Sequence, residues 1–187
     1  SVRNFGKQMR MGVKELLKNE YIKKISSFYI LVGSISWLCM LIFNNTLLVQ
    51  LGHTNQEIGI IFSVLRIINS LVIYKLLNIG SLFTKKKAFL FFPIIMIFSL
   101  LPGVFFVKWF AIPFVAGSMI ASTARWVVLG KYVNREFDSA HRATANSALS
   151  MAINIIYVAV AFVSGPFMER YGGTKMMYTI FGVVSLI

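Results

Sequence analysis

The sequence predicts an all-α membrane protein, a bundle of transmembrane helices, and three observations predict it. Apolar residues make up 57% of the 187 residues and charged residues 13%, whereas soluble domains have about 45–50% and about 25%. The apolar residues gather in runs long enough to cross roughly 30 Å of hydrocarbon. These runs do not alternate in polarity, which argues against the strands of a membrane barrel. Lipid is therefore the expected solvent for most of the chain.

Residues 1–24 form a basic leader ahead of the first apolar run. Its apolar side chains are Phe5, Met9, Val13, Leu16 and Leu17. That spacing fits an amphipathic helix lying on the inner leaflet, and a plain solvated linker fits the same residues equally well. The expected organisation is a cytoplasmic linker at 1–24 and a transmembrane bundle at 25–187.

Five apolar runs are long enough to span the bilayer as helices, because about 20 residues at 1.5 Å each cross it. In chain order they are 25–49, 58–79, 88–107, 110–130 and 143–167, and a partial sixth covers 176–187. Short connectors make neighbouring spans antiparallel. The chain begins at Ser1, without Met, and ends inside an apolar run, so we interpret it as part of a longer protein.

Basic residues are distributed unequally between the two sides of the predicted bundle. The leader and the connectors on its side hold thirteen Lys and Arg residues, and the opposite connectors hold three. The positive-inside rule therefore places the leader in the cytoplasm of a multi-pass protein of the cell membrane. Because the basic residues sit in short clusters between apolar runs, we expect the lipid bilayer as their partner and no nucleic acid.

Two arginines lie within the spans, where a charge costs about 2.5–3.5 kcal/mol on insertion scales. Arg66 is deep in the second span, and we expect it to face a cavity. Arg125 is nearer the cytoplasmic end of the fourth span, where a cavity-facing and a snorkelling position are equally compatible with the sequence. Lys75 is close enough to a span end to snorkel to the interface.

Polar residues at helical spacing accompany the arginines and recur on the first and fifth spans. They are Ser34, Trp37 and Asn45; Ser63, Asn69 and Ser70; Ser118 and Ser122; and Asn146, Ser150, Asn154 and Tyr157. Such stripes are typical of helices around a water-filled cavity, and interhelical hydrogen bonds explain them as well. The candidate residues lining a substrate cavity are Arg66, Arg125, Trp37, Asn45, Asn69, Asn154 and Tyr157.

The six acidic residues all lie in the leader or in connectors. The two arginines therefore need a counter-ion from elsewhere, either a carboxylate of a missing part of the protein or an anionic group of a substrate. No phosphate-binding loop, HExxH or CxxC motif occurs, and His53 and His141 fall on opposite sides of the membrane. We expect neither an enzyme nor a cofactor or metal site.

Three stretches resemble the C-terminal half of the major facilitator superfamily of transporters. They are Gln50–Leu51–Gly52 with 56–62, the Arg142–Ala143–Thr144 connector, and the segment 165–172 with Glu169–Arg170. The resemblance covers family helices seven to eleven and part of twelve. The connector 80–87 departs from the family pattern, because it keeps the glycine and the basic run but lacks the acidic residue.

The resemblance implies a secondary active transporter that moves a small molecule by alternating access between two six-helix bundles. The missing N-terminal half would be the partner of this bundle, proton coupling would be expected, and drug exporters are favoured among the branches. Arg66 and Arg125 would contact an anionic group of the substrate or a carboxylate of the other half. The alternative function is a non-transporting membrane receptor or scaffold subunit with the same bundle.

Overall fold

The computed structural model describes residues 2–78 and 84–186, and this part of the chain is helical, with no strand. Five of its helices are long and apolar enough to cross a membrane, which confirms the prediction of five spans. They cover Glu20–Gln50, Asn55–Leu76, Lys86–Phe105, Ile112–Glu136 and Arg142–Tyr171. Residues 80–83 of the predicted connector, residue 79 and the chain ends 1 and 187 lie outside the described residues.

The helical elements follow one another with short connections, and two of the five spans contain a π-helical turn between two α-helices. The elements are α1 (Val2–Leu16), α2 (Glu20–Leu38), η1 (Cys39–Phe43), α3 (Asn44–Gln50), α4 (Asn55–Asn78), α5 (Lys85–Leu100), η2 (Gly103–Phe105), α6 (Ile112–Ala124), η3 (Arg125–Leu129), α7 (Gly130–Glu136), α8 (Arg142–Tyr171) and α9 (Thr174–Val184). One span runs through α2, η1 and α3, and another runs through α6, η3 and α7. Both η1 and η3 are π-helical turns.

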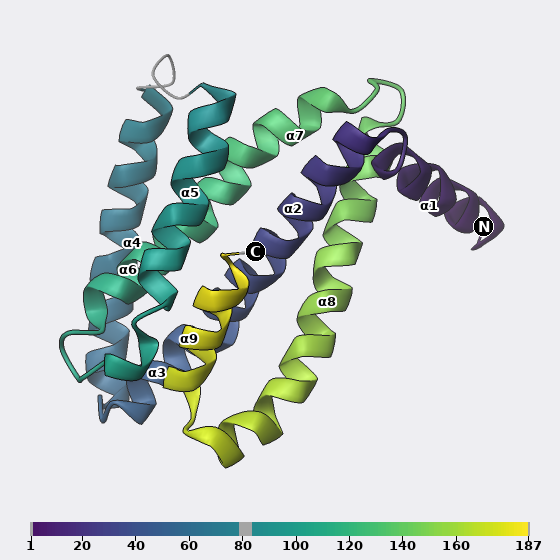
Figure 1. Ribbon diagram of the computed structural model, residues 1–187. Helices are drawn as coiled ribbons and strands as arrows, with labels where there is room; N and C mark the ends of the chain where they lie inside the picture. The colour runs from purple at the N-terminus through teal and green to yellow at the C-terminus, as the bar shows by residue number, and fades with distance from the viewer. Residues whose placement is uncertain (1, 79–83, 187) are drawn as a thin grey trace.

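The helices form two layers. In the first, α4 packs on α6, α6 on α2 and α2 on α8, so these four lie side by side in that order. In the second, α5 packs on α6 and on α9, and α9 also contacts α3 and α8. Figure 1 shows α5 and α9 crossing one side of the first layer. The surface hollows described below are lined by α8 and by the two spans that contain α2 and α6.

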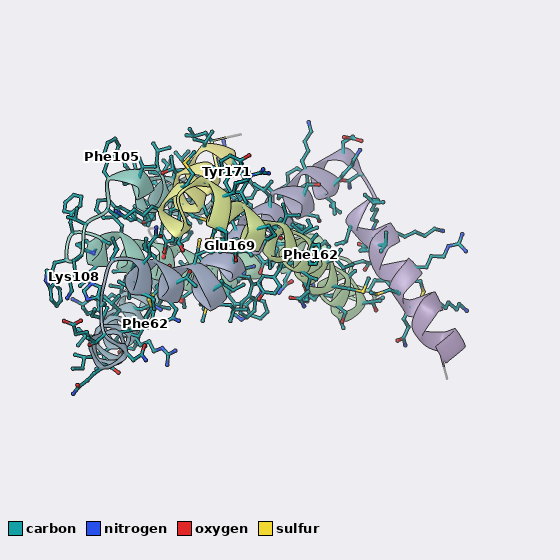
Figure 2. All side chains as sticks on the ribbon, turned by 90° about the horizontal axis from the view of Figure 1, so that it is seen from below. Phe62, Phe105, Lys108, Phe162, Glu169 and Tyr171 are labelled. Atoms are coloured by element: carbon teal, nitrogen blue, oxygen red, sulfur yellow. The ribbon has the colours of Figure 1, made fainter. Side chains whose placement is uncertain are left out.

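The outside of the bundle is apolar, unlike the surface of a soluble protein. Large apolar side chains remain exposed along α4, α5 and α8, and Phe105 and Phe162 (Figure 2) are 75% and 83% exposed. Exposed apolar patches of this extent mark contact with a membrane or another protein. Together with the length of the helices, this surface identifies a helical membrane protein.

Buried hydrogen bonds join the helices of the two layers. The Asn44 side chain is 1% exposed, and its Oδ1 accepts hydrogen bonds from the Tyr178 hydroxyl of α9 and from Ser118 Oγ of α6. Ser34 Oγ lies 3.4 Å from the carbonyl oxygen of Ile153 in α8 and also donates to its own helix. Part of the polar stripe of the first span therefore serves helix packing, as one of the two interpretations of the sequence expects.

The leader contains a helix, α1, which packs on the start of α8. Gly12 makes the close approach possible, because a Cβ at this position would lie 2.5 Å from the carbonyl oxygen of Thr144. Glu15 is 6% exposed, and its Oε1 accepts hydrogen bonds from the backbone N–H of Asp138 and from Lys18 Nζ. This carboxylate ties α1 to the connector between α7 and α8.

The buried hydrogen bonds of Asn44 lead to a prediction about stability. Asn44→Ala removes the acceptor of the buried Tyr178 hydroxyl, whereas Ser118 Oγ can still donate to the carbonyl oxygen of Val115. A buried group left unpaired costs about 1–3 kcal/mol. We expect the free energy of unfolding, measured by SDS titration in mixed micelles, to fall by that amount. Asn45→Ala is the matched control, because Asn45 is exposed and its loss should cost under about 0.5 kcal/mol. Equal effects of the two substitutions would contradict the role of Asn44.

Candidate functional site

The two long composite spans deviate from regular α-helix where they contact each other. The π-helical turn η1 in the first span contacts α6, and the π-helical turn η3 in the fourth contacts α2. A hollow of about 260 Å³ lies between these spans, lined by Trp37, Met40, Ser122, Thr123, Arg125 and Trp126. We call this the Arg125 hollow. π-helical turns are rare in proteins, and those that occur are often found at functional sites. The first and fourth spans therefore carry the strongest local signal of a site.

Arg125 is a buried charge without a counter-ion. Arg125 is 2% exposed. Its Nε and Nη1 atoms have no hydrogen-bond partner in the described part of the chain. No described acidic residue forms an ion pair with it. A buried guanidinium normally has such a partner, so Arg125 lacks the pairing that is usual for a buried charge.

Aromatic rings provide part of the compensation. The guanidinium carbon of Arg125 lies 5.1 Å from the ring centroid of Tyr29 and 5.6 Å from that of Trp126. Each cation–π contact contributes about 0.5–2 kcal/mol, which is comparable with the cost of placing one charge in a membrane helix. Gly33 provides the space, because a Cβ at this position would lie 3.0 Å from Arg125 Nη1.

A second hollow of about 430 Å³ adjoins the first, and Trp126 lines both. We call it the Lys131 hollow. It lies between α2, the η3–α7 segment and α8, and its polar lining consists of Tyr29, Trp126, Lys131, Asn134, Asn146 and Ser150. No acidic side chain lines either hollow. The charged groups around the two hollows are therefore Arg125 and Lys131, both cations.

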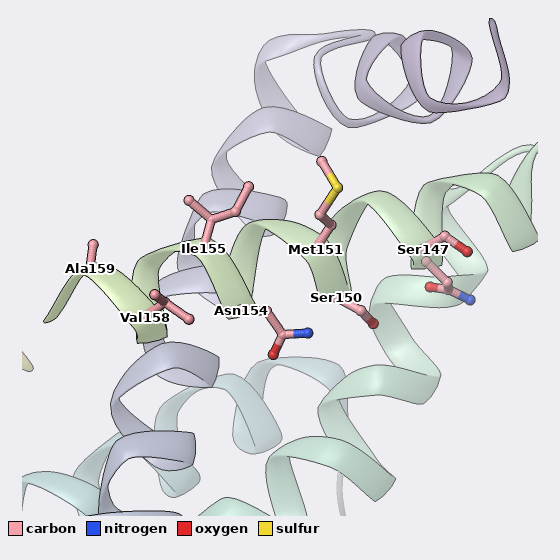
Figure 3. A pocket seen from close by; sticks show the side chains of 8 residues that line it. Ser147, Ser150, Met151, Asn154, Ile155, Val158 and Ala159 are labelled. Carbon is pink, nitrogen blue, oxygen red and sulfur yellow. The ribbon is translucent and has the colours of Figure 1, made fainter. Parts of the chain in front are cut away.

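The polar stripe of α8 borders a third, shallow hollow of about 830 Å³ along that helix. Figure 3 shows Ser150 and Asn154 projecting from one side of α8, whereas Met151 and Ile155 project from the opposite side. Ser150 also lines the Lys131 hollow, which adjoins the Arg125 hollow at Trp126. The polar stripe of α8 is therefore connected to the Arg125 hollow through the Lys131 hollow. Tyr157, the last residue of this stripe, is partly buried against the main apolar core.

On α4, Asn69 is connected to the Arg125 hollow and Arg66 is not. Asn69 Nδ2 donates a hydrogen bond of 2.8 Å to Thr123 Oγ1, and Thr123 lines the hollow. Arg66 lies one helical turn before Asn69, a neighbouring position on the helix surface, and its side chain is exposed. Among the described residues none forms an ion pair with Arg66, and its place in a cavity stays a prediction.

The structure thus brings together some of the residues that the sequence singles out. Trp37 and Arg125 line the Arg125 hollow, and Asn69 forms a hydrogen bond with Thr123, another of its lining residues. Asn45 is exposed at the other end of its span and is not part of this group. Sequence reasoning missed Tyr29 and Trp126, although Tyr29, Gly33 and Trp37 follow one another at four-residue spacing, which places them on one face of a helix.

A separate charged cluster joins two connectors at the opposite end of the bundle. His53 Nε2 lies 2.9 Å from the carbonyl oxygen of Lys108, and Nδ1 lies 3.6 Å from Glu57 Oε2. Lys108 Nζ lies 3.5 Å from Glu57 Oε1, and the His53 ring packs edge-on against Trp109. This cluster ties the connector before α4 to the one before α6. The described residues contain no group of three side chains that could hold a metal ion.

No family model, curated protein or solved structure matches this chain.

The unpaired charge yields a prediction about stability. Arg125→Met removes a guanidinium that has no acidic partner and keeps a long side chain in the space. The lost cation–π contacts and the relieved burial of charge are of similar size. We therefore expect the free energy of unfolding of the purified full-length protein to stay within about 1 kcal/mol of the wild-type value or to rise. A loss above about 3 kcal/mol would reveal a paired charge and would contradict the description of Arg125.

Proposed function

We propose that this chain forms one wall of a secondary active transporter, with the fold of the major facilitator superfamily, which carries a small molecule across the membrane by alternating access. One observation carries the proposal: a buried, unpaired Arg125 lines a hollow between membrane-spanning helices. An ionisable residue inside a membrane segment is costly, and its usual role is on a substrate or ion pathway.

The distribution of polar groups supports this proposal. The hollows at Arg125 and Lys131 and the polar stripe of α8 belong to α2, α6, α7 and α8, and the Asn69–Thr123 bond links α4 to the same surface. In the resembled family, helices seven, eight, ten and eleven face the cavity, and these correspond to α2, α4, the α6–α7 span and α8. Helices nine and twelve lie outside the cavity in that family, and they would correspond to α5 and α9, which line none of the three hollows.

In the proposed mechanism, a second six-helix bundle of the same protein faces this wall and closes the cavity. Rocking of the two bundles would expose the site first to one side of the membrane and then to the other. An anionic group of the substrate would pair with Arg125 while the site is closed to water, where charge interactions are stronger than in bulk solvent. A proton-carrying carboxylate would come from the second bundle, since the acidic residues of this chain lie in the leader, in connectors or near helix ends.

Arg66 provides the first functional test, with Lys75 of the same helix as its control. Both side chains are exposed on α4, but Arg66 is deep in the span and Lys75 is near its end. Vesicles containing the full-length protein are screened with radiolabelled organic solutes, and the solute taken up is used for both variants. We expect Arg66→Gln to abolish uptake at unchanged protein level and Lys75→Gln to retain it. Unchanged uptake by Arg66→Gln would remove this residue from the site.

Thiol accessibility distinguishes a transporter from a non-transporting receptor or scaffold subunit. The native cysteine of this chain, Cys39, is buried and should react slowly with thiol reagents. The reaction of a cysteine introduced on α8 can therefore be distinguished from that of Cys39. In a transporter, Asn154→Cys should react with a water-soluble methanethiosulfonate in intact membranes, and a carried solute should change the rate.

Phe162→Cys is the matched control for this accessibility test, because Phe162 is also highly exposed on α8 but lies among apolar residues that we expect to face lipid. Its rate should be at least about tenfold lower, since the charged thiol reagent is excluded from hydrocarbon. Equal, slow reaction at both positions would favour the scaffold function and contradict the proposal.

A further inference from the structure

The Arg125 and Lys131 hollows form two unlike halves of one site. They share the Trp126 side chain, which is 57% exposed. The Arg125 hollow is mostly aromatic and apolar, with Trp37, Trp126 and Met40 along its walls. The Lys131 hollow is more polar and includes Asn134 and Asn146. Such a division is typical of sites for small molecules that combine an apolar body with a polar group.

The charges of the two hollows select for an anion. Arg125 and Lys131 are cations, and no carboxylate lines either hollow. A cationic ligand would meet two like charges without compensation, whereas an anion would supply the partner that Arg125 Nε and Nη1 lack. Charge interactions are stronger in a partly buried site than in bulk water, so the two cations favour an anionic ligand over a cationic one.

The walls select for a flat ring system. Two of the three tryptophans of the chain, Trp37 and Trp126, line the Arg125 hollow, and aromatic rings attract one another beyond the effect of the area that they bury. A cavity of about 150 Å³ holds benzene, so a hollow of about 260 Å³ has space for a two-ring body. The hydroxyl of Thr123 already accepts from Asn69 and donates to the carbonyl oxygen of Met119, which leaves the indoles as the main contact surface.

We infer that the ligand of this site is an aromatic organic anion, a carboxylate or sulfonate on a one- or two-ring body, and this inference rests on the proposed transport function. Its acidic group lies against the Arg125 guanidinium, and its rings contact Trp37 and Trp126. Lys131 adds a long-range attraction from the adjoining hollow.

Three naphthalene probes of similar size test the inference. The purified full-length protein in detergent is titrated by calorimetry with 2-naphthoate, with neutral 2-naphthamide and with the cation of 2-naphthylmethylamine. We expect 2-naphthoate to bind at least about tenfold more tightly than the amide, a difference of about 1.4 kcal/mol, and the ammonium to bind most weakly. Equal affinity for the acid and the amide, or no binding of the acid, would overturn the inference.

Single substitutions test which residue binds the acidic group of the ligand and which residue contacts its rings. Arg125→Gln should bring the affinity for 2-naphthoate down to that for the amide, and Arg125→Lys, which keeps the charge, should retain part of the preference. Trp37→Ala should weaken the acid and the amide by the same factor, because Trp37 lines the hollow and the rings that stack on the Arg125 guanidinium are those of Tyr29 and Trp126. Lys75→Gln, outside the site, should leave all affinities unchanged. A full preference for the acid in Arg125→Gln would overturn the role of this arginine.

The same probes separate the ligand class from the transport function. Selective binding of 2-naphthoate through Arg125, without flux of 2-naphthoate in proteoliposomes, would support the ligand class and contradict transport by this protein. Flux of amides or ammonium compounds with no flux of 2-naphthoate would support transport and overturn the ligand class.

Discussion

The candidate site depends on one physical constraint, the burial of an arginine charge that no acidic side chain of the described residues neutralises. Around Arg125, the rings of Tyr29 and Trp126 provide polarisable faces and Gly33 provides space. The charge sits at the first residue of the π-helical turn η3, where the regular helical hydrogen-bond pattern changes. A structure that served stability alone would place a leucine or methionine here, because the apolar side chain buries no charge.

Several polar side chains elsewhere in the bundle join helices through hydrogen bonds. Arg125 Nε and Nη1, like Ser26 Oγ, His53 Nδ1 and Asn69 Oδ1, have no hydrogen-bond partner among the described residues. Asn44 bonds to two other helices, Asn69 bonds to Thr123, and Glu15 ties α1 to the connector before α8. These bonds hold the helices in place at about 0.5–1.5 kcal/mol each. Paired groups thus join the helices, whereas the unpaired Arg125 borders a hollow, where we propose that it pairs with an anionic group of a ligand.

The sequence predicted the spans well, because length and hydropathy along a helix are directly readable, but it predicted the site only in part. The depth of Arg66 and Arg125 in their spans follows from position, whereas their burial depends on how each helix is rotated against its neighbours. The π-helical turns rotate all residues beyond them relative to a regular helix, so stripes extrapolated across η1 lose their register. That is why Asn45 was singled out, whereas its neighbour Asn44 makes the buried contacts.

The central claim is that Arg125 places an uncompensated positive charge beside a hollow that water reaches. The most direct measurement compares a sulfonate-bearing and a trimethylammonium-bearing methanethiosulfonate on Thr123→Cys in the full-length protein. The ratio of their reaction rates should favour the anionic reagent and should fall at least about tenfold in the Arg125→Gln background, since a nearby charge acts on the two reagents with opposite sign. An unchanged ratio, or no reaction with either reagent, would contradict the account.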